Sequence, residues 1–228
     1  MVDSLPRVHA DITACTHCAR LVRCRERAAA APPRRFVGAT YWARAVPGFG
    51  DPRARLLVVG LAPAAHGGNR TGRVFTGDRS GDWLYAALHR AGFANQPTSV
   101  ARDDGLALRD AYVTTVVRCA PPGNKPSPAE RDRCLPFLVR ELGALAHVRA
   151  IVALGAFAWD GTLRALRDLG HDLGGPRPTF AHAAHARIGP YALFGSYHVS
   201  QQNTFTGRLT EPMLDAVFAA AARAARGE

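Results

Sequence analysis

Four of the five cysteines have the spacing of metal ligands. Cys15 and Cys18 form a C-x2-C pair, Cys119 directly follows a predicted strand, and Cys134 lies on the next predicted helix. Two thiolates at this spacing can bind one metal, and in a chain without a secretory signal such cysteines are metal ligands more often than disulfides. The spacing fits zinc and a [4Fe–4S] cluster equally, because both accept four thiolates. We expect the fifth cysteine, Cys24, to be a free thiol.

A second candidate segment, residues 60–78, is rich in Gly, Ala and Thr and follows an apolar run. It lacks both the Gly-Lys-Ser/Thr end of a phosphate-binding loop and the spacing of a dinucleotide fingerprint. Its small residues let the backbone approach a flat ligand closely, and Phe75 could stack on that ligand. Asp78 is the only carboxylate of the segment and stands where a helix should begin. The helix dipole favours its ionised form there, but a lone Asp at this place most often simply caps the helix.

A third candidate segment begins at His198, at the end of a predicted strand, and continues as a run of small polar residues. Ser, Gln, Asn and Thr side chains are donors that suit contact with a phosphate backbone. The alternative is a solvated turn with a hydrogen-bonded histidine. Together with Arg70 and Lys125 in other loops, the candidate DNA-contacting residues are Ser200, Gln201, Gln202, Asn203 and Arg208.

The charge of the chain favours a polyanionic partner. Its formal net charge is +11, from 29 basic and 18 acidic residues. Every basic residue except Lys125 is an arginine, whose planar guanidinium binds phosphate in a bidentate way. A GC-rich coding sequence would also produce arginine, together with the abundant Ala, Gly and Pro. The composition alone leaves both explanations open.

Length and composition exclude several classes of protein. The chain has 228 residues, of which 47% are hydrophobic and 21% charged, as in ordinary globular domains. These values exclude a disordered chain, a coiled coil and a collagen. No run of about 18 apolar residues occurs and no apolar stretch follows Met1, so we expect no membrane span, no secretory signal and a cytoplasmic location.

Apolar runs and capping signals predict the elements that position these residues. The predicted strands are 55–60, 111–117, 150–155 and 191–198, and each is short and apolar on both faces. Helices are predicted near 18–31, from 78 or 80 to 88, from 127 toward 146, over 157–169 and over 211–226, the third opened by a capping box at Ser127. The rest of residues 1–53 looks irregular.

Alternating strands and helices indicate a single three-layer α/β/α domain with a four-stranded parallel sheet. We divide it into a core, residues 54–228, and an N-terminal segment, residues 1–53, held to the core by the metal site. In such sheets ligands bind at the carboxyl ends of the strands. The three candidate segments should therefore meet at one site.

Three segments, in this order, resemble the uracil-DNA glycosylase superfamily, and most of all its family 5, the type-b enzymes with an iron–sulfur cluster. They are 60–78, 117–126 and 198–208, and they occur together with the four-cysteine pattern. The resemblance implies a structural [4Fe–4S] cluster. Its ligands would be Cys15, Cys18, Cys119 and Cys134.

The resemblance also implies the activity: a monofunctional glycosylase, acting on DNA as a monomer, that starts base excision repair. The damaged nucleotide is flipped out, stacks on Phe75 and receives a hydrogen bond from His198, while the loop after His198 enters the duplex. Asp78 would offset positive charge on the sugar and orient the attacking water. His198 and nearby backbone N–H groups would stabilise the departing base anion.

Two departures from the family pattern predict a broad substrate range. Sister families carry a carboxylate where this chain has Leu61 and Ala62, and close relatives have Asn where it has Thr115. We therefore expect hypoxanthine and related deaminated bases as substrates besides uracil. The residues expected against the base are Gly60, Ala62, Pro63, Phe75 and Thr115.

Two other readings of the sequence remain. A non-catalytic nucleic-acid-binding protein with a zinc or iron–sulfur site would account for the charge and the cysteines. It would not account for Phe75, Asp78 and His198 at converging strand ends. An enzyme acting on free nucleotides is disfavoured because the phosphate-loop pattern is missing.

Overall fold

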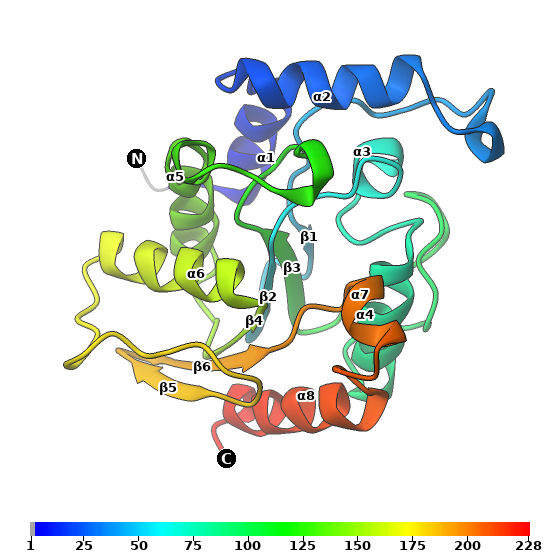
Figure 1. Cartoon of the computed structure of the whole chain (residues 1–228). Coiled ribbons are helices and arrows are strands. Elements are labelled where there is room, and N and C mark those ends of the chain that lie inside the picture. Colours follow the sequence, from blue (N-terminus) through cyan, green and yellow to red (C-terminus); the bar gives the residue numbers. More distant parts are fainter. Residues whose placement is uncertain (1–2) are drawn as a thin grey trace.

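The four predicted apolar runs form the parallel centre of one sheet (Figure 1). In this computed structural model, which describes residues 3–228, the central strands are β2 (Leu56–Gly60), β3 (Ala111–Thr115), β4 (Ala150–Leu154) and β6 (Tyr191–Ser196). They lie in the order β3-β2-β4-β6 and are all parallel. All residues of these strands except Tyr191 are buried, because helices cover both faces of the sheet.

The prediction of a four-stranded sheet was wrong in number, because the sheet has six strands. β1 (Phe49–Gly50) pairs antiparallel with β3, and β5 (His185–Ile188) pairs antiparallel with β6. β1 has only two residues, and His185 and Arg187 of β5 are exposed. Edge strands of this kind lack the continuous apolar run by which buried strands are recognised in a sequence.

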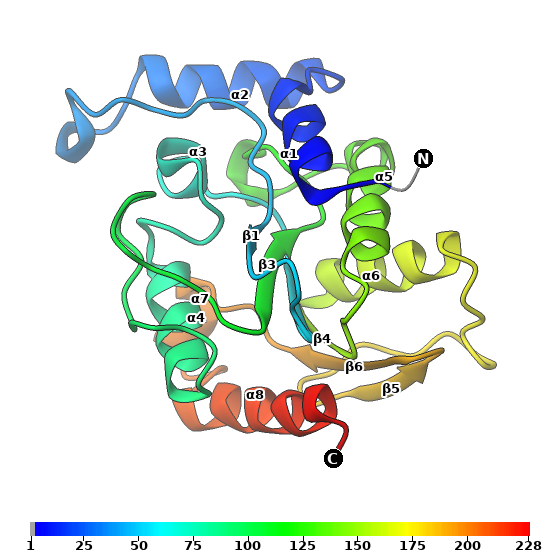
Figure 2. The ribbon, with the colours of Figure 1, turned by 180° about the vertical axis from the view of Figure 1, so that it is seen from behind.

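Two layers of helices sandwich the sheet (Figures 1 and 2). On one face α1 (Leu5–Ala14), α5 (Pro128–Ala144) and α6 (Ala156–Asp168) pack with Leu57 and Val59 of β2 in one hydrophobic cluster. On the other face α4 (Arg79–Arg90) and α8 (Glu211–Arg226) pack with Leu56 and Val58 in a second. Alternate residues of β2 therefore serve different layers, as strand geometry requires.

The segment before β2 is more regular than predicted. The expected helix near residues 18–31 is α2 (Ala19–Ala30), and a single 3₁₀ turn, η1 (Arg34–Phe36), follows it. The sequence analysis missed α1, whose buried residues Leu5, Val8 and Ile12 face α5. Their spacing of three and four residues is a helical stripe that the sequence does carry.

Capping signals position the helices near the strand ends. Ser127 and Glu130 form the predicted capping box of α5, and Asp78 caps α4. Pro136 lies inside α5 without ending the helix. None of the helices in residues 3–228 is long and apolar enough to cross a membrane.

Candidate active site

The carboxyl ends of three strands bring the predicted base-binding residues together. Gly60 pairs in register with Thr115 of the neighbouring strand. A side chain at Gly60 would overlap the Phe75 ring, so this position requires the close approach that only Gly allows. The rings of Phe75 and His198 lie 6.3 Å apart, inclined by 35°. Gly60, Phe75 and His198 thus border one site, as the order of strands predicted.

Phe75 is held in an unusual backbone conformation. Its φ is +51°, in the left-handed region that non-Gly residues seldom occupy. The carbonyl of Val74, the residue before Phe75, accepts a hydrogen bond of 3.0 Å from the buried Tyr85 hydroxyl of α4. This hydrogen bond stabilises the turn. Strain of this kind persists where the surroundings hold it, and it is common at functional sites.

Asp78 caps α4, so the simpler of its two predicted roles is confirmed. Its Oδ1 accepts a hydrogen bond of 3.0 Å from the Gly81 N–H. The second oxygen, Oδ2, faces Gly67 so closely that any side chain there would collide with it. Burial raises the pKa of Asp78, although the N–H groups of Gly81 and Ser80 act in the opposite direction. Helix capping therefore uses Oδ1, and Oδ2 does not take part in the hydrogen bond from Gly81.

His198 lies half-buried just beyond β6. Burial lowers its pKa to about 4, so the imidazole is neutral at neutral pH and has one N–H to donate. Its carbonyl accepts a hydrogen bond of 2.8 Å from the Asn203 side chain. A Cβ on Gly155 would stand 3.3 Å from the His198 Cβ, which places the end of β4 directly against this histidine.

The polar segment after His198 is partly helical rather than an open loop. Ser200 caps a short helix, α7 (Gln201–Phe205), by accepting from the Asn203 N–H. Ser200 and Asn203 therefore have structural hydrogen bonds, whereas Gln201, Gln202 and Arg208 are exposed. The sequence analysis missed Phe205, which is 66% exposed and has the Arg79 guanidinium 4.9 Å above its ring. The sequence does carry a signal for Phe205, because it is an aromatic residue within a run of polar residues.

Arg70 and Lys125 differ in their surroundings. The Arg70 Nε donates to the His66 carbonyl at 2.9 Å, and its guanidinium stacks on Phe36 at 4.4 Å. Arg70 thus stabilises its own loop. The Lys125 side chain is exposed, and its carbonyl accepts from Arg20 at 3.1 Å.

The remaining predicted base-binding residues present few polar groups. The Thr115 hydroxyl is buried and donates to the Val117 carbonyl at 2.9 Å. Pro63 is buried against Gly68, and Ala62 is half-buried at the edge of the core. The lining near Gly60 is therefore mainly apolar.

The four predicted ligand cysteines line one small pocket between the α1–α2 turn, the loop after β3 and α5. Cys119 and Cys134 are buried, which raises the pKa of Cys119 to about 11 and that of Cys134 to about 12. All five cysteines are free, and Cys24 does not line the pocket. In residues 3–228 no three His, Cys, Asp or Glu side chains are placed to hold a single metal ion.

Two arginines beside this pocket were not found from the sequence. The Arg25 guanidinium donates from Nη1 to the Cys119 Sγ at 3.2 Å. The backbone N–H of Arg118 donates to the Cys134 Sγ at 3.3 Å. The Arg118 side chain is buried in an ion pair with Glu141, with 2.7 Å between Nη2 and Oε2. No spacing rule could have found these contacts, because the partners lie far apart along the chain.

Comparison with known proteins confirms the resemblance. The family model of the uracil DNA glycosylase superfamily matches residues 47–222. The chain is 54% identical over 217 residues to the type-5 uracil-DNA glycosylase of Mycobacterium bovis, covering 94% of this chain and 80% of the relative. It is 50% identical over 217 residues to the type-5 enzyme of Thermus thermophilus, covering 94% and 95%. A type-4 uracil-DNA glycosylase of Pyrobaculum aerophilum matches only half of the chain, at 36% identity. The chain therefore belongs to the uracil-DNA glycosylase superfamily.

Proposed function

We propose that this protein removes uracil from DNA by hydrolysing the N-glycosidic bond, the step that starts base excision repair. The observation that carries the proposal is the approach of the Phe75 and His198 rings near the ends of β2 and β6, with Asp78 three residues after Phe75 at the start of α4. The identity to type-5 uracil-DNA glycosylases over nearly the whole chain supports it.

Each residue has a role that its surroundings suit. A stacked base is out of reach, so the nucleotide must leave the helix, and Phe75 offers a ring face for it. The neutral His198 donates a hydrogen bond to the base, where negative charge develops as the bond breaks. A neutral donor stabilises the anion without needing a proton from solvent.

Asp78 acts on the sugar side of the bond. Its raised pKa makes the carboxylate a stronger base than an exposed aspartate, and Oδ2 remains beside Gly67 while Oδ1 caps α4. It offsets positive charge on the deoxyribose and orients the attacking water. Helix capping and catalysis are thus compatible in one side chain.

We propose a substrate range wider than uracil. Leu61 and Ala62 supply no carboxylate, and the Thr115 hydroxyl is already bound to a carbonyl. An apolar lining rejects an altered base less strongly than a set of matched hydrogen bonds does. Hypoxanthine is therefore expected to be released as well.

The cysteine pocket suits a structural [4Fe–4S] cluster held by Cys15, Cys18, Cys119 and Cys134. The N–H donors of Arg25 and Arg118 at two of the sulfurs are the kind of contact that stabilises cluster thiolates. A four-iron cluster is wider than one ion, so it needs ligands further apart than a zinc ion does. When bound, it would cross-link the α1–α2 turn to α5 and the loop after β3.

Release of free base tests the proposed activity. The purified protein is incubated with a uracil-containing oligonucleotide, and we expect free uracil and an alkali-labile site in the strand. A matched oligonucleotide with thymine in place of uracil is the control. Binding of the uracil strand without base release would instead support the non-catalytic nucleic-acid-binding alternative.

A further inference from the structure

A second cavity lies on the opposite side of the molecule from α7. It has a volume of about 600 Å³ and is bordered by α1, α2, the segment before β1 and the loop that carries Arg102. Figure 2 shows α1 in front, whereas α7 is in front in Figure 1. Of its lining residues, none belongs to the site around His198. A cavity of this size is within the usual range for small ligands, roughly 300–1,000 Å³.

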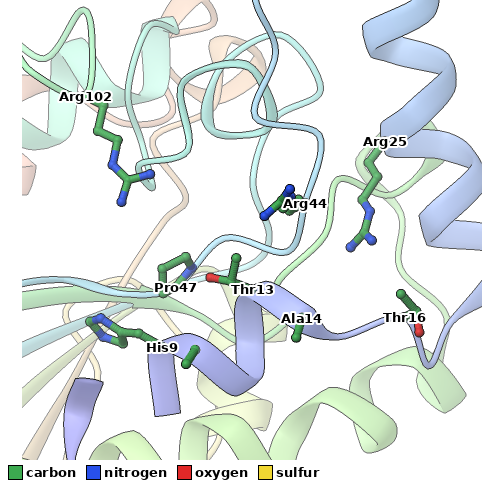
Figure 3. A pocket seen from close by; sticks show the side chains of 9 residues that line it. His9, Thr13, Ala14, Thr16, Arg25, Arg44, Pro47 and Arg102 are labelled. Atoms are coloured by element: carbon green, nitrogen blue, oxygen red, sulfur yellow. The ribbon is translucent and has the colours of Figure 1, made fainter. Parts of the chain in front are cut away.

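The cavity carries a concentrated positive charge. Arg25, Arg44 and Arg102 line it, and no Asp or Glu does (Figure 3). Within residues 3–228, none of the three forms an ion pair with a carboxylate. Ten other arginines of the same part do pair with a carboxylate, so the charge of these three is not neutralised in this way. Arg25 is buried, whereas Arg44 and Arg102 are exposed and screened by water. An anion in the cavity would be attracted by all three guanidinium groups.

Arg25 is the most constrained of the three. It is only 4% exposed, and its Nη1 donates to the Cys15 carbonyl and the Cys119 sulfur. Its Nε is a buried donor without an acceptor in the described part of the chain. Buried donors in proteins nearly always have a partner, so the missing acceptor points to a group that the protein does not supply.

Arg44 and Arg102 are held in place from outside the cavity. Arg102 stacks on the Trp42 ring at 4.5 Å, and Arg44 lies 6.0 Å from the same ring. The residue before Arg44, Ala43, adopts a left-handed φ of +49°. Stacking restricts both side chains, so less entropy is lost when they bind a ligand.

We propose that this cavity binds the phosphate group of a small phosphorylated ligand, of about the size of a mononucleotide. A guanidinium group can donate two parallel hydrogen bonds to two oxygens of one phosphate group. A halide ion has only one atom and cannot accept them in this way. The Thr13 hydroxyl and the imidazole of His9 add polar groups, and Ala10, Ala14 and Pro47 provide an apolar wall for the rest of the ligand. The proposal is independent of the glycosylase activity.

Calorimetric titration tests the proposal with three probes: inorganic phosphate, thymidine 5′-monophosphate and thymidine. We expect the first two to bind and thymidine, which lacks the phosphate, not to bind. Arg44→Gln and Arg102→Gln should each weaken binding at least about tenfold, the effect of losing a hydrogen bond to a charged group. Arg25 is left intact because it also contacts the cysteine pocket.

Arg109→Gln is the matched control, since Arg109 is exposed and lies outside the cavity. It should leave binding unchanged at the same ionic strength. An equal loss in all three variants would mean general surface charge, and unaltered binding in Arg44→Gln and Arg102→Gln would place the probe elsewhere. Either outcome, or no binding of the phosphate probes, overturns the proposal. If only an undamaged DNA duplex loses affinity in these two variants, the cavity is a DNA-backbone contact and the small-ligand proposal is wrong.

Discussion

Burial drives the two central side chains toward their neutral forms. It raises the pKa of Asp78 and lowers that of His198 to about 4. In the proposed mechanism, the neutral form of His198 would donate a hydrogen bond to the departing base at neutral pH. For Asp78 the same effect makes the ionised form a stronger base, at a cost in stability. The two shifts therefore suit opposite ends of the glycosidic bond.

Asp78→Asn separates capping from catalysis. Asn caps a helix about as well as Asp, so the fold and the affinity for DNA should remain. Base release should slow by about 10²–10⁴-fold for every substrate base, because a positioned base is lost. Single-turnover kinetics on uracil and hypoxanthine strands measure this. Asp82→Asn, an exposed acid in the same helical turn, is the control; a wild-type rate in Asp78→Asn would refute the catalytic role.

His198→Ala should affect the bases unequally. If its donor stabilises negative charge on the leaving base, the loss in rate should be larger for whichever of hypoxanthine and uracil forms the less stable anion. The ratio of the two single-turnover rates is the measurement. Removing the exposed His89 should leave that ratio unchanged. An identical loss on both bases would mean that His198 acts on the shape of the site rather than on the leaving group.

The lowered pKa of His198 also predicts a pH dependence of stability. Below about pH 6.5 the unfolded chain takes up a proton on His198 that the folded protein does not take up until about pH 4. Wild type should therefore lose stability across this window relative to His198→Gln, by about 1 kcal/mol at pH 5.5. Thermal denaturation of both proteins between pH 7.5 and pH 5.0 measures the difference. A difference that stays constant with pH would contradict the lowered pKa of His198.

At the scale of elements, the cysteine pocket joins three parts of the fold that lie far apart in the sequence. It links the α1–α2 turn to α5 and to the loop after β3, while the Arg20–Glu130 pair connects α2 to the start of α5. A cross-link here would keep the loop after β3 close to the active site. The cluster is thus expected to act on loop position rather than on the reacting bond.

Cysteine variants test which thiols hold the cluster. Cys134→Ser removes a ligand from α5, so iron content and the brown colour of the purified protein should be lost. Cys24→Ser should keep both, because Cys24 does not line the pocket. Iron analysis and visible absorbance of each variant give the answer. Loss of iron in Cys24→Ser with full iron in Cys134→Ser would overturn the assignment of the ligands. A colourless wild-type protein that contains zinc would show that the site holds a zinc ion instead of a cluster.

At the scale of the whole molecule, the arginines serve more than one purpose. Within residues 3–228 ten of them form ion pairs with carboxylates, among them Arg73 with Asp104 and Arg118 with Glu141. Others, such as Arg208 and Arg79, are exposed near α7. The ion pairs account for the position of ten arginines, and both coding bias and phosphate binding remain open as explanations for the exposed ones.

Salt dependence distinguishes phosphate contact from an incidental basic surface. Counterion release makes the affinity for DNA fall steeply with salt, by about 10-fold or more between 50 and 200 mM when several phosphates are contacted. Fluorescence anisotropy with an undamaged duplex measures the slope. Arg208→Gln should reduce the slope, whereas Arg109→Gln should not. An affinity that barely changes with salt would return the arginines to the coding-bias explanation.

Sequence by itself determined the centre of the fold and the order of the site. A strand buried on both faces must be apolar throughout, so the central strands could be read directly, and parallel strands align their carboxyl ends. The Ser127 capping box and the position of Asp78 at a helix start depend only on neighbouring residues. Because parallel strands align their carboxyl ends, Phe75 and His198, which follow two of these strands, could be assigned to one site from the sequence.

Tertiary structure alone decided what depends on partners distant in the chain. β1 and β5 exist because neighbouring strands offer edge hydrogen bonds, and their residues carry little apolar pattern. Arg70 turns inward to its own loop, which its type and position did not reveal. Arg25, Arg44 and Arg102 carry a charge that sequence shows, but whether a carboxylate neutralises that charge is set by packing over long distances. Local patterns determine elements, whereas the partners of a charge are determined only when those elements meet.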